Sequence, residues 1–182
     1  MHIGIDDFGA INSSRGAAYG NYILKSVADC MKECLSDKQR IYHLVADQYV
    51  IVDLEHSSKD YAAELKKKID DRLYKFIVSE NYEAVFSISV GVVDAVTFCE
   101  GYEECRKKFA FVLKKAKKMG KNGFYIFDDN DYESFLRTGK IVAALRNSVV
   151  NGFNGFEVYY QPIVDCSSER VIGAEALMRF SM

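Results

Sequence analysis

The sequence is poor in proline, lacks tryptophan and contains no long apolar run. Its 182 residues include a single proline, Pro162, and no tryptophan. No apolar run approaches the about 18 residues of a membrane-spanning helix, and the opening MHIGIDDFG is acidic rather than basic as in a secretory signal. A Gly/Ser/Pro-rich linker is also missing, so a second domain would be joined by a structured segment. We therefore expect neither secretion nor membrane contact from this stretch.

An excess of charge of one sign is absent as well. Lys and Arg number 24 and Asp and Glu 26, which gives a net charge of -2. This balance provides no overall attraction to nucleic acid or to anionic membranes. With 49% hydrophobic and 27% charged residues, the composition is typical of a globular protein of one or two domains.

Cysteine occurs five times, an odd number without paired spacing. Cys30 and Cys34 stand one helical turn apart in an apolar-periodic run with no histidine nearby, which indicates buried thiols rather than a zinc site. Reduced thiols of this kind predict a cytoplasmic protein.

The hydrophobic pattern predicts an α+β domain over residues 1–128. A strand around Ile3 and Ile5 leads into a Gly/Asn/Ser-rich loop over 11–21, after which a helix begins with Asn21 as its cap. The remaining predicted elements are strands over 41–44 and 49–54 joined as a hairpin, a helix over 58–77, a strand over 84–93, a helix over 103–119 ended by Gly120, and a strand over 123–127. This order contains the ferredoxin-like split unit, so we expect an antiparallel-rich sheet flanked by helices.

Beyond residue 128 the pattern changes. Residues 129–155 contain a long amphipathic stretch that predicts a connecting helix, and 156–182 read as two strands around a short loop. A hairpin after a helix has no core of its own, so we expect the opening of a second, truncated barrel domain. Its apolar residues should pack on the domain's own surface, pair with a second copy of the chain or be disordered. They are Val158, Tyr160, Ile163, Val171, Ile172 and Leu177.

Five motifs in this order resemble the GGDEF domain of diguanylate cyclases. They are IDDFGAIN, the pair Gly16 and Gly20, HLVADQYVIV, SISVGV and KKAKKMGKNGFYIF. Over about 136–182, YYQPIVD and GAEALMRF are similar to the start of an EAL domain, the family of cyclic di-GMP phosphodiesterases. The resemblance implies a nucleotide-cyclase-like fold over 1–128 without the family's leading helices, and the N-terminal part of an EAL domain over 156–182.

The resemblance also implies a catalytic site from which this sequence departs. A cyclase that joins two GTP molecules needs carboxylates on Mg²⁺ ions that bridge the phosphates. One metal carboxylate belongs two residues before Asp6, where this sequence has Gly4, whereas Asp47 matches the second and is the residual metal ligand.

The signature loop, residues 45–49, is altered in the same way. Val45 and Ala46 replace its two glycines, Gln48 replaces the acid after Asp47, and Tyr49 follows. A β-branched residue resists positive φ, and Cβ bulk keeps the backbone away from a triphosphate.

The nucleotide-binding positions are partly retained. Asn12 matches the family's base-binding asparagine, whereas Asn21 replaces an aspartate and loses charge assistance of about 1 kcal/mol. Gly9 replaces a phosphate-contacting lysine. Lys117 and Lys121 match the family's phosphate-contacting basic pair, and the alternative is a merely solvated face of a lysine-rich helix.

Two further motifs complete the comparison with the family. The inhibitory RxxD motif is absent, with Ser36 and Gln39 where its ends would fall. In the EAL-like segment the resemblance implies Gln161 as a substrate contact, Glu175 as a metal ligand and Arg179 as a phosphate contact. One glutamate cannot form a two-metal site, so this segment alone should be inactive.

Two functional hypotheses follow. In the first, a catalytically degenerate GGDEF domain acts as a regulatory, GTP-sensing or interaction module for a downstream EAL phosphodiesterase domain, with GTP or cyclic di-GMP as ligand and only weakly held Mg²⁺. In the second, the chain is an active diguanylate cyclase that makes cyclic di-GMP from two GTP molecules as a homodimer. The second hypothesis rests on Asp47, Asn12 and the two lysines. Detection of the product separates the two.

Overall fold

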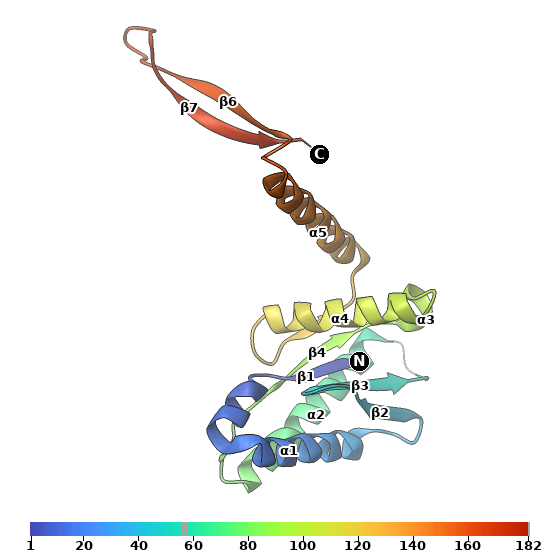
Figure 1. Ribbon diagram of the computed structural model, residues 1–182. Helices are drawn as coiled ribbons and strands as arrows, with labels where there is room; N and C mark the ends of the chain where they lie inside the picture. Colours follow the sequence, from blue (N-terminus) through green and yellow to red (C-terminus); the bar gives the residue numbers. More distant parts are fainter. Residues whose placement is uncertain (56–57, 182) are drawn as a thin grey trace. The chain divides into compact units, whose positions relative to one another are not determined.

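The computed structural model describes residues 1–55 and 58–181, and the chain divides into two compact units, residues 1–128 and 129–182 (Figure 1). Met182, the last residue of the EAL-like segment, lies outside the described residues. The elements of the first unit are β1 (His2–Ile5), α1 (Phe8–Cys34), β2 (Gln39–His43), β3 (Gln48–Asp53), α2 (Lys59–Ser79), β4 (Ile88–Val92), α3 (Ala95–Phe98), α4 (Tyr102–Lys118) and β5 (Phe124–Ile126).

The first unit is built on one sheet with the strand order β2-β3-β1-β4-β5. The neighbouring strands run antiparallel except β4 and β5, which are parallel. The predicted hairpin is confirmed, with Ile41 opposite Ile51. The expected α+β fold with an antiparallel-rich sheet flanked by helices is therefore confirmed.

Helices cover both faces of this sheet, with α1 and α2 on one side and α4 on the other (Figure 1). The central strand β1 is accordingly buried along its whole length. Its Ile3 and Ile5 belong to the core that α1 and α2 complete, whereas Gly4 faces α4. Helix α4 also lies close to Gly91 of β4, where an added Cβ would stand 2.5 Å from the backbone carbon of Val112.

The predicted loop over 11–21, with Asn21 as a helix cap, is wrong. These residues belong to α1, which begins at Phe8 and is interrupted only at Gly16, where φ is 82° and ψ is 164°. The serines that suggested a loop bond to the helix itself, since the hydroxyl of Ser13 donates to the carbonyl of Gly9 at 2.9 Å. Packing of the buried Ile11 adds to this, so tertiary burial outweighs a composition that favours turns.

The other elements lie close to their predicted bounds. Helix α2 begins after Ser58, whose hydroxyl accepts the backbone N–H of Tyr61 at 3.0 Å. Gly120, predicted to end the last helix of this unit, has φ 113° and follows Met119, the residue that caps α4. Strand β4 begins only at Ile88, and the sequence analysis missed the short helix α3, which Asp94 caps.

The second unit consists of α5 (Asp129–Val150), β6 (Phe156–Val164) and β7 (Val171–Phe180). The two strands pair antiparallel as a hairpin, as predicted. Of the apolar side chains for which packing, self-association or disorder was expected, most are exposed on an ordered hairpin; Tyr160 is 72% exposed. Ile163, Val171 and Ile172 share this exposure.

The five cysteines are free thiols, and Cys30 and Cys34 are buried as predicted. Burial raises the pKa of both thiols. Within the described residues, no helix is both long and apolar enough to cross a bilayer.

Candidate functional site

The signature loop forms a tight turn between β2 and β3. The backbone N–H of Gln48 donates to the carbonyl of Val45 at 3.0 Å, and that of Leu44 donates to Gln48 at 2.9 Å. The left-handed conformation falls on Ala46, with φ 51°, and the exposed Val45 avoids it. The loss of the first glycine is therefore accommodated, and the strain is taken by an alanine.

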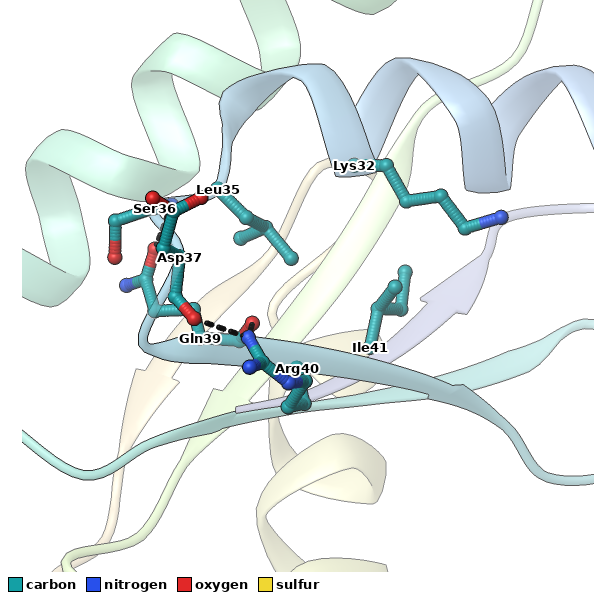
Figure 2. A pocket seen from close by; sticks show the side chains of 7 residues that line it. All are labelled: Lys32, Leu35, Ser36, Asp37, Gln39, Arg40 and Ile41. Atoms are coloured by element: carbon teal, nitrogen blue, oxygen red, sulfur yellow. Dashed lines mark hydrogen bonds between the residues drawn. The ribbon is translucent and has the colours of Figure 1, made fainter.

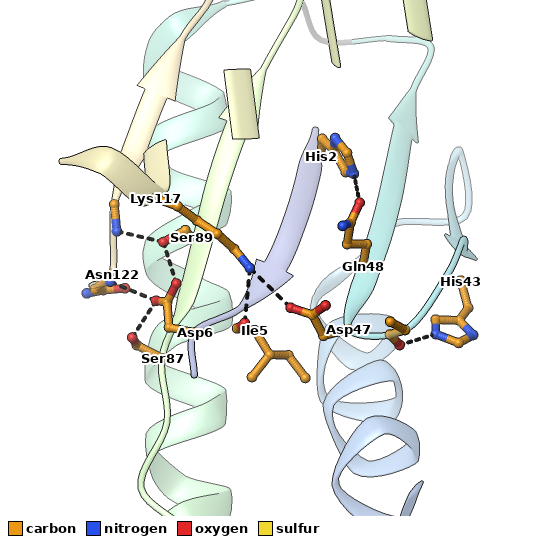
Figure 3. A network of polar contacts seen from close by, with 12 residues as sticks. His2, Ile5, Asp6, His43, Asp47, Gln48, Ser87, Ser89, Lys117 and Asn122 are labelled. Carbon is orange, nitrogen blue, oxygen red and sulfur yellow. Dashed lines mark hydrogen bonds and ion pairs between the residues drawn. The ribbon is translucent and has the colours of Figure 1, made fainter. Parts of the chain in front are cut away.

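Asp47, in the turn between β2 and β3, lies beside the end of β1 and is paired with a lysine. Its carbonyl accepts the backbone N–H of Ile5 at 3.2 Å, which fixes the turn beside the central strand. Its carboxylate lies 3.1 Å from the ammonium of Lys117, which comes from the last turn of α4 (Figure 3). Lys117 is thus drawn to this carboxylate and is not simply part of a solvated helix face.

The side chains of the next two residues of the loop, Gln48 and Tyr49, bond to other parts of the domain. The side-chain oxygen of Gln48 lies 3.0 Å from Nε2 of the buried His2 (Figure 3). Tyr49 is buried and donates its hydroxyl to the carbonyl of Leu24 at 2.8 Å. Burial, with the nearby charge of Asp47, raises the pKa of Tyr49 to about 12.

The two asparagines expected to bind a base lie on α1, on either side of its break at Gly16. The side chain of Asn12 rests on Gly20, where an added Cβ would stand 1.8 Å from its Oδ1. Asn21 is the next residue and is exposed. The break at Gly16 therefore turns Asn12 back toward the segment that carries Asn21, and Gly20 provides the space.

Lys121, the second expected phosphate contact, is paired with an acid near the start of α1. Its ammonium lies 2.5 Å from the carboxylate of Asp7, and both side chains are exposed. The bond to Asp7 raises the pKa of Lys121. A phosphate that bound Lys117 or Lys121 would therefore have to compete with the carboxylate of Asp47 or of Asp7.

A second polar cluster, which was not predicted from the sequence, is centred on Asp6 (Figure 3). The buried carboxylate of Asp6 accepts the hydroxyls of Ser87 at 2.6 Å and Ser89 at 2.7 Å and the backbone N–H of Asn122 at 2.9 Å. Two serines at alternate positions, Ser87 just before β4 and Ser89 within it, were the available signal, because they lie on one face. The carboxylate of Asp6 therefore has a structural role in this domain.

The segment where the inhibitory RxxD motif would fall borders an open groove of about 570 Å³ between the end of α1 and the start of β2 (Figure 2). Ser36 and Gln39 both line it. Gln39, however, is buried and its amide donates to Asp53 at 2.5 Å and to Tyr61 at 3.0 Å. Gln39 thus joins β2 to β3 and α2 rather than facing a ligand.

In the second unit, the three EAL-like residues share one face of the hairpin. Gln161 of β6 lies opposite Glu175 of β7, and Arg179 lies four residue pairs further along, opposite Glu157. All of them are exposed. Because side chains alternate along a strand, this register brings an amide, a carboxylate and a guanidinium to the same surface.

The carboxylates that could bind a divalent cation in the first unit are occupied by other groups of the chain. Within residues 1–55 and 58–181, no three His, Cys, Asp or Glu side chains come together as a metal site. In the first unit the carboxylate of Asp47 is paired with the ammonium of Lys117, and the carboxylate of Asp6 already accepts three hydrogen bonds. Mg²⁺ requires hard oxygen ligands at short distance, which this arrangement does not leave available.

Comparison with known proteins agrees with the fold. The family model described as "Diguanylate cyclase, GGDEF domain" matches residues 1–123. The cyclic di-GMP phosphodiesterase NbdA of Pseudomonas aeruginosa is 26% identical over 182 residues, which cover 99% of this chain and 23% of the relative. The chain spans less than a quarter of the length of the first three curated relatives it matches, between 20% and 23%.

Solved structures show the same fold at low sequence identity. The GGDEF domain of TpbB (YfiN) from Pseudomonas aeruginosa superposes with a TM-score of 0.64 at 16% identity, over 74% of this chain and 79% of that one. The S helix-GGDEF-EAL segment of LapD from Vibrio cholerae, bound to c-di-GMP, gives a TM-score of 0.52 at 13% identity, over 100% of this chain and 42% of that one. The family match over most of the chain shows that this protein belongs to the diguanylate cyclase GGDEF-domain family.

Proposed function

We propose that residues 1–128 form a catalytically degenerate GGDEF domain that senses guanine nucleotide and regulates an EAL phosphodiesterase domain. The observation that carries this proposal is the pairing of Asp47, the single acid of the signature turn, with Lys117 at 3.1 Å. Gly4 offers no second carboxylate beside it. Joining two triphosphates requires cations that bridge the phosphates, and one acid bound to an ammonium cannot hold them.

Nucleotide binding is supported by what remains around the turn. Asn12 and Asn21 come from neighbouring parts of the broken helix α1 and offer amides for a base. Lys117 and Lys121 offer two cations for phosphates once Asp47 and Asp7 release them. These residues favour binding without turnover.

The regulated activity belongs, in this proposal, to a domain that begins within the second unit. We assign residues 129–155 to a connecting helix and 156–182 to the N-terminal part of an EAL domain. Gln161, Glu175 and Arg179 on one face of the hairpin agree with this assignment, as does the exposure of its apolar side chains. A barrel would supply the missing partners of these strands, and the relative NbdA, which is a cyclic di-GMP phosphodiesterase, is matched over 99% of this chain.

Incubation with GTP and either Mg²⁺ or Mn²⁺, followed by mass spectrometry, tests the catalytic part of the proposal. We expect no cyclic di-GMP over several hours, together with calorimetric binding of GTP but not of ATP. Appreciable synthesis of cyclic di-GMP would overturn the regulatory assignment in favour of an active cyclase. A longer chain that includes the rest of the barrel tests the regulatory part, because its phosphodiesterase rate should change when GTP is added.

A second copy of the chain is a further partner in this proposal. Until a barrel covers them, the exposed apolar residues of β6 and β7 can pair with the same residues of another chain. Light scattering of this chain and of the longer one checks it, since association should disappear when the barrel is complete. A monomer at all concentrations would contradict pairing through the hairpin.

A further inference from the structure

The ammonium of Lys117 sits among oxygen atoms that would suit a metal ion. It lies 3.1 Å from Oδ2 of Asp47 and 3.3 Å from the backbone carbonyl oxygen of Ile5 at the end of β1 (Figure 3). A carboxylate and a backbone carbonyl are the hard oxygen donors that divalent cations use in proteins. In this structure both are engaged by a monovalent group of the chain itself.

Gly4 makes room for this arrangement. An added Cβ at Gly4 would stand 2.8 Å from Cε and 2.9 Å from Nζ of Lys117. Position 4 is where the GGDEF resemblance places a metal carboxylate. A side chain at position 4 and the ammonium in its present place therefore exclude each other, and the glycine and the lysine act as a matched pair.

The ion pair is partly shielded from water. The side chain of Asp47 is 18% exposed and that of Lys117 is 37% exposed, whereas the neighbouring pair of Lys121 and Asp7 is 74% and 60% exposed. Shielding strengthens the attraction between opposite charges relative to a fully solvated pair. The backbone bond from Ile5 to the carbonyl of Asp47 also holds the carboxylate in place.

Two neighbouring polar side chains that could serve as further ligands are already engaged. Asp6 is filled by three donors, and the side chain of Gln48 is turned toward His2. A cation that entered would have to displace the ammonium and would then meet one carboxylate and one carbonyl. Mg²⁺, which gives up its water reluctantly, gains little from so few ligands.

We propose that the ammonium of Lys117 takes the place of the divalent cation in this pocket, so that the domain is a GGDEF domain with a built-in cation. This inference rests on the proposed function and deepens it, because a pocket that holds an ammonium cannot hold the metal ion that synthesis of cyclic di-GMP requires. Any phosphate ligand of the pocket is then bound in its metal-free form, because its negative charge meets an ammonium rather than a bridging ion.

Titration with Mn²⁺ followed by electron paramagnetic resonance tests this without any nucleotide. Wild-type protein should leave the Mn²⁺ signal free, whereas Lys117→Ala should bind the ion at least about tenfold more tightly, since a positive charge next to Asp47 is removed. The double variant Gly4→Asp/Lys117→Ala should bind more tightly still, because the substitution at position 4 adds a second carboxylate. Lys121→Ala is the matched control and should bind no better than wild type.

Two results would overturn the inference. One is Mn²⁺ binding to wild-type protein as tight as to Lys117→Ala and lost in Asp47→Asn. The other is the absence of any gain in both Lys117→Ala variants while circular dichroism shows them folded. GTP calorimetry is a separate measurement, so loss of the nucleotide-sensing proposal and loss of the built-in cation are distinguishable.

Discussion

The carboxylate of Asp6 lies 2.9 Å from the backbone N–H of Asn122, and this hydrogen bond joins the end of the central strand to the turn between α4 and β5. Hydroxyls of Ser87 and Ser89 complete the coordination of the same carboxylate. An acid next to the signature turn thus holds three segments together. Its replacement should change stability first.

Asp6→Asn should lower the free energy of unfolding by about 2 to 3 kcal/mol, because an amide keeps only one acceptor oxygen for the three donors and loses the negative charge that strengthens their hydrogen bonds. Asp7→Asn is the matched control. Asp7 is exposed and its pair with Lys121 is solvated, so the change should stay within about 0.5 kcal/mol. Urea unfolding of both variants measures the difference, and equal effects would contradict the role given to Asp6.

Gly91 is expected to be indispensable for the packing of α4 on β4. Gly91→Ala should cost about 3 kcal/mol, since its Cβ would lie 2.5 Å from the backbone carbon of Val112 and 2.7 Å from the nitrogen of Leu113. Gly9→Ala introduces the same methyl group where no described atom lies within 4 Å, and should raise stability by up to about 1 kcal/mol. Thermal unfolding gives both values. A tolerated alanine at position 91 would show that α4 can move away.

The sequence predicts this fold well wherever burial repeats with a clear period. The strands around Ile3 and Ile51 and the amphipathic helix α4 were found because their buried residues follow the periods of strand and helix. The first half of α1 was not found, since its alanines, serines and glycines resemble a turn and only the burial of residues such as Ile11 makes it helical. Local composition could not reveal that.

The site shows a similar division. Sequence comparison could identify Gly4 as a missing carboxylate and Lys117 as a cation, each taken separately. It could not show that the two are linked, because the contact between position 4 and Lys117 joins segments over a hundred residues apart and depends on the direction of one flexible side chain. The role of Asp6 was hidden for the same reason, since Ser87, Ser89 and Asn122 come from another strand and turn.

The alanine in the signature turn should be a source of strain. Ala46 has φ 51°, so Ala46→Gly removes a left-handed alanine and should stabilise the protein by about 0.5 kcal/mol after the entropy of the added glycine is counted. Ala63→Gly is the control, because an exposed position inside α2 should lose about 1 kcal/mol through the same chemical change. Opposite signs in chemical unfolding confirm the strain at Ala46.

His2 should make the stability depend on pH. Burial lowers the pKa of His2 below the ordinary 6.5, and the charges of the N-terminus and of Lys117 add to this, although bonds to Phe109 and Gln48 oppose the shift. The unfolded chain therefore takes up a proton at a higher pH than the folded one. The stability that neutral His2 provides is complete above about pH 6.5 and is lost as the pH falls toward the lower pKa of the folded state.

Urea unfolding at about pH 7.5 and about pH 5.5 checks this effect. His2→Gln should be less stable than wild type at the higher pH and should show a smaller loss between the two values. In His43→Gln the loss should remain, because His2 is still present. An unchanged loss in His2→Gln would assign the pH dependence to other groups.

The last prediction concerns the base-binding asparagines of the proposed nucleotide site. Asn21→Asp places a charged acceptor on the exposed face of α1 and should raise the affinity for GTP about fivefold, since a charge-assisted hydrogen bond adds about 1 kcal/mol. Asn12→Ala should lower it about tenfold, because an amide that packs on Gly20 is removed. Calorimetry with GTP measures both changes, and ATP serves as the control ligand. If Asn21→Asp strengthens ATP binding equally, the gain does not depend on the base and Asn21 does not face a guanine.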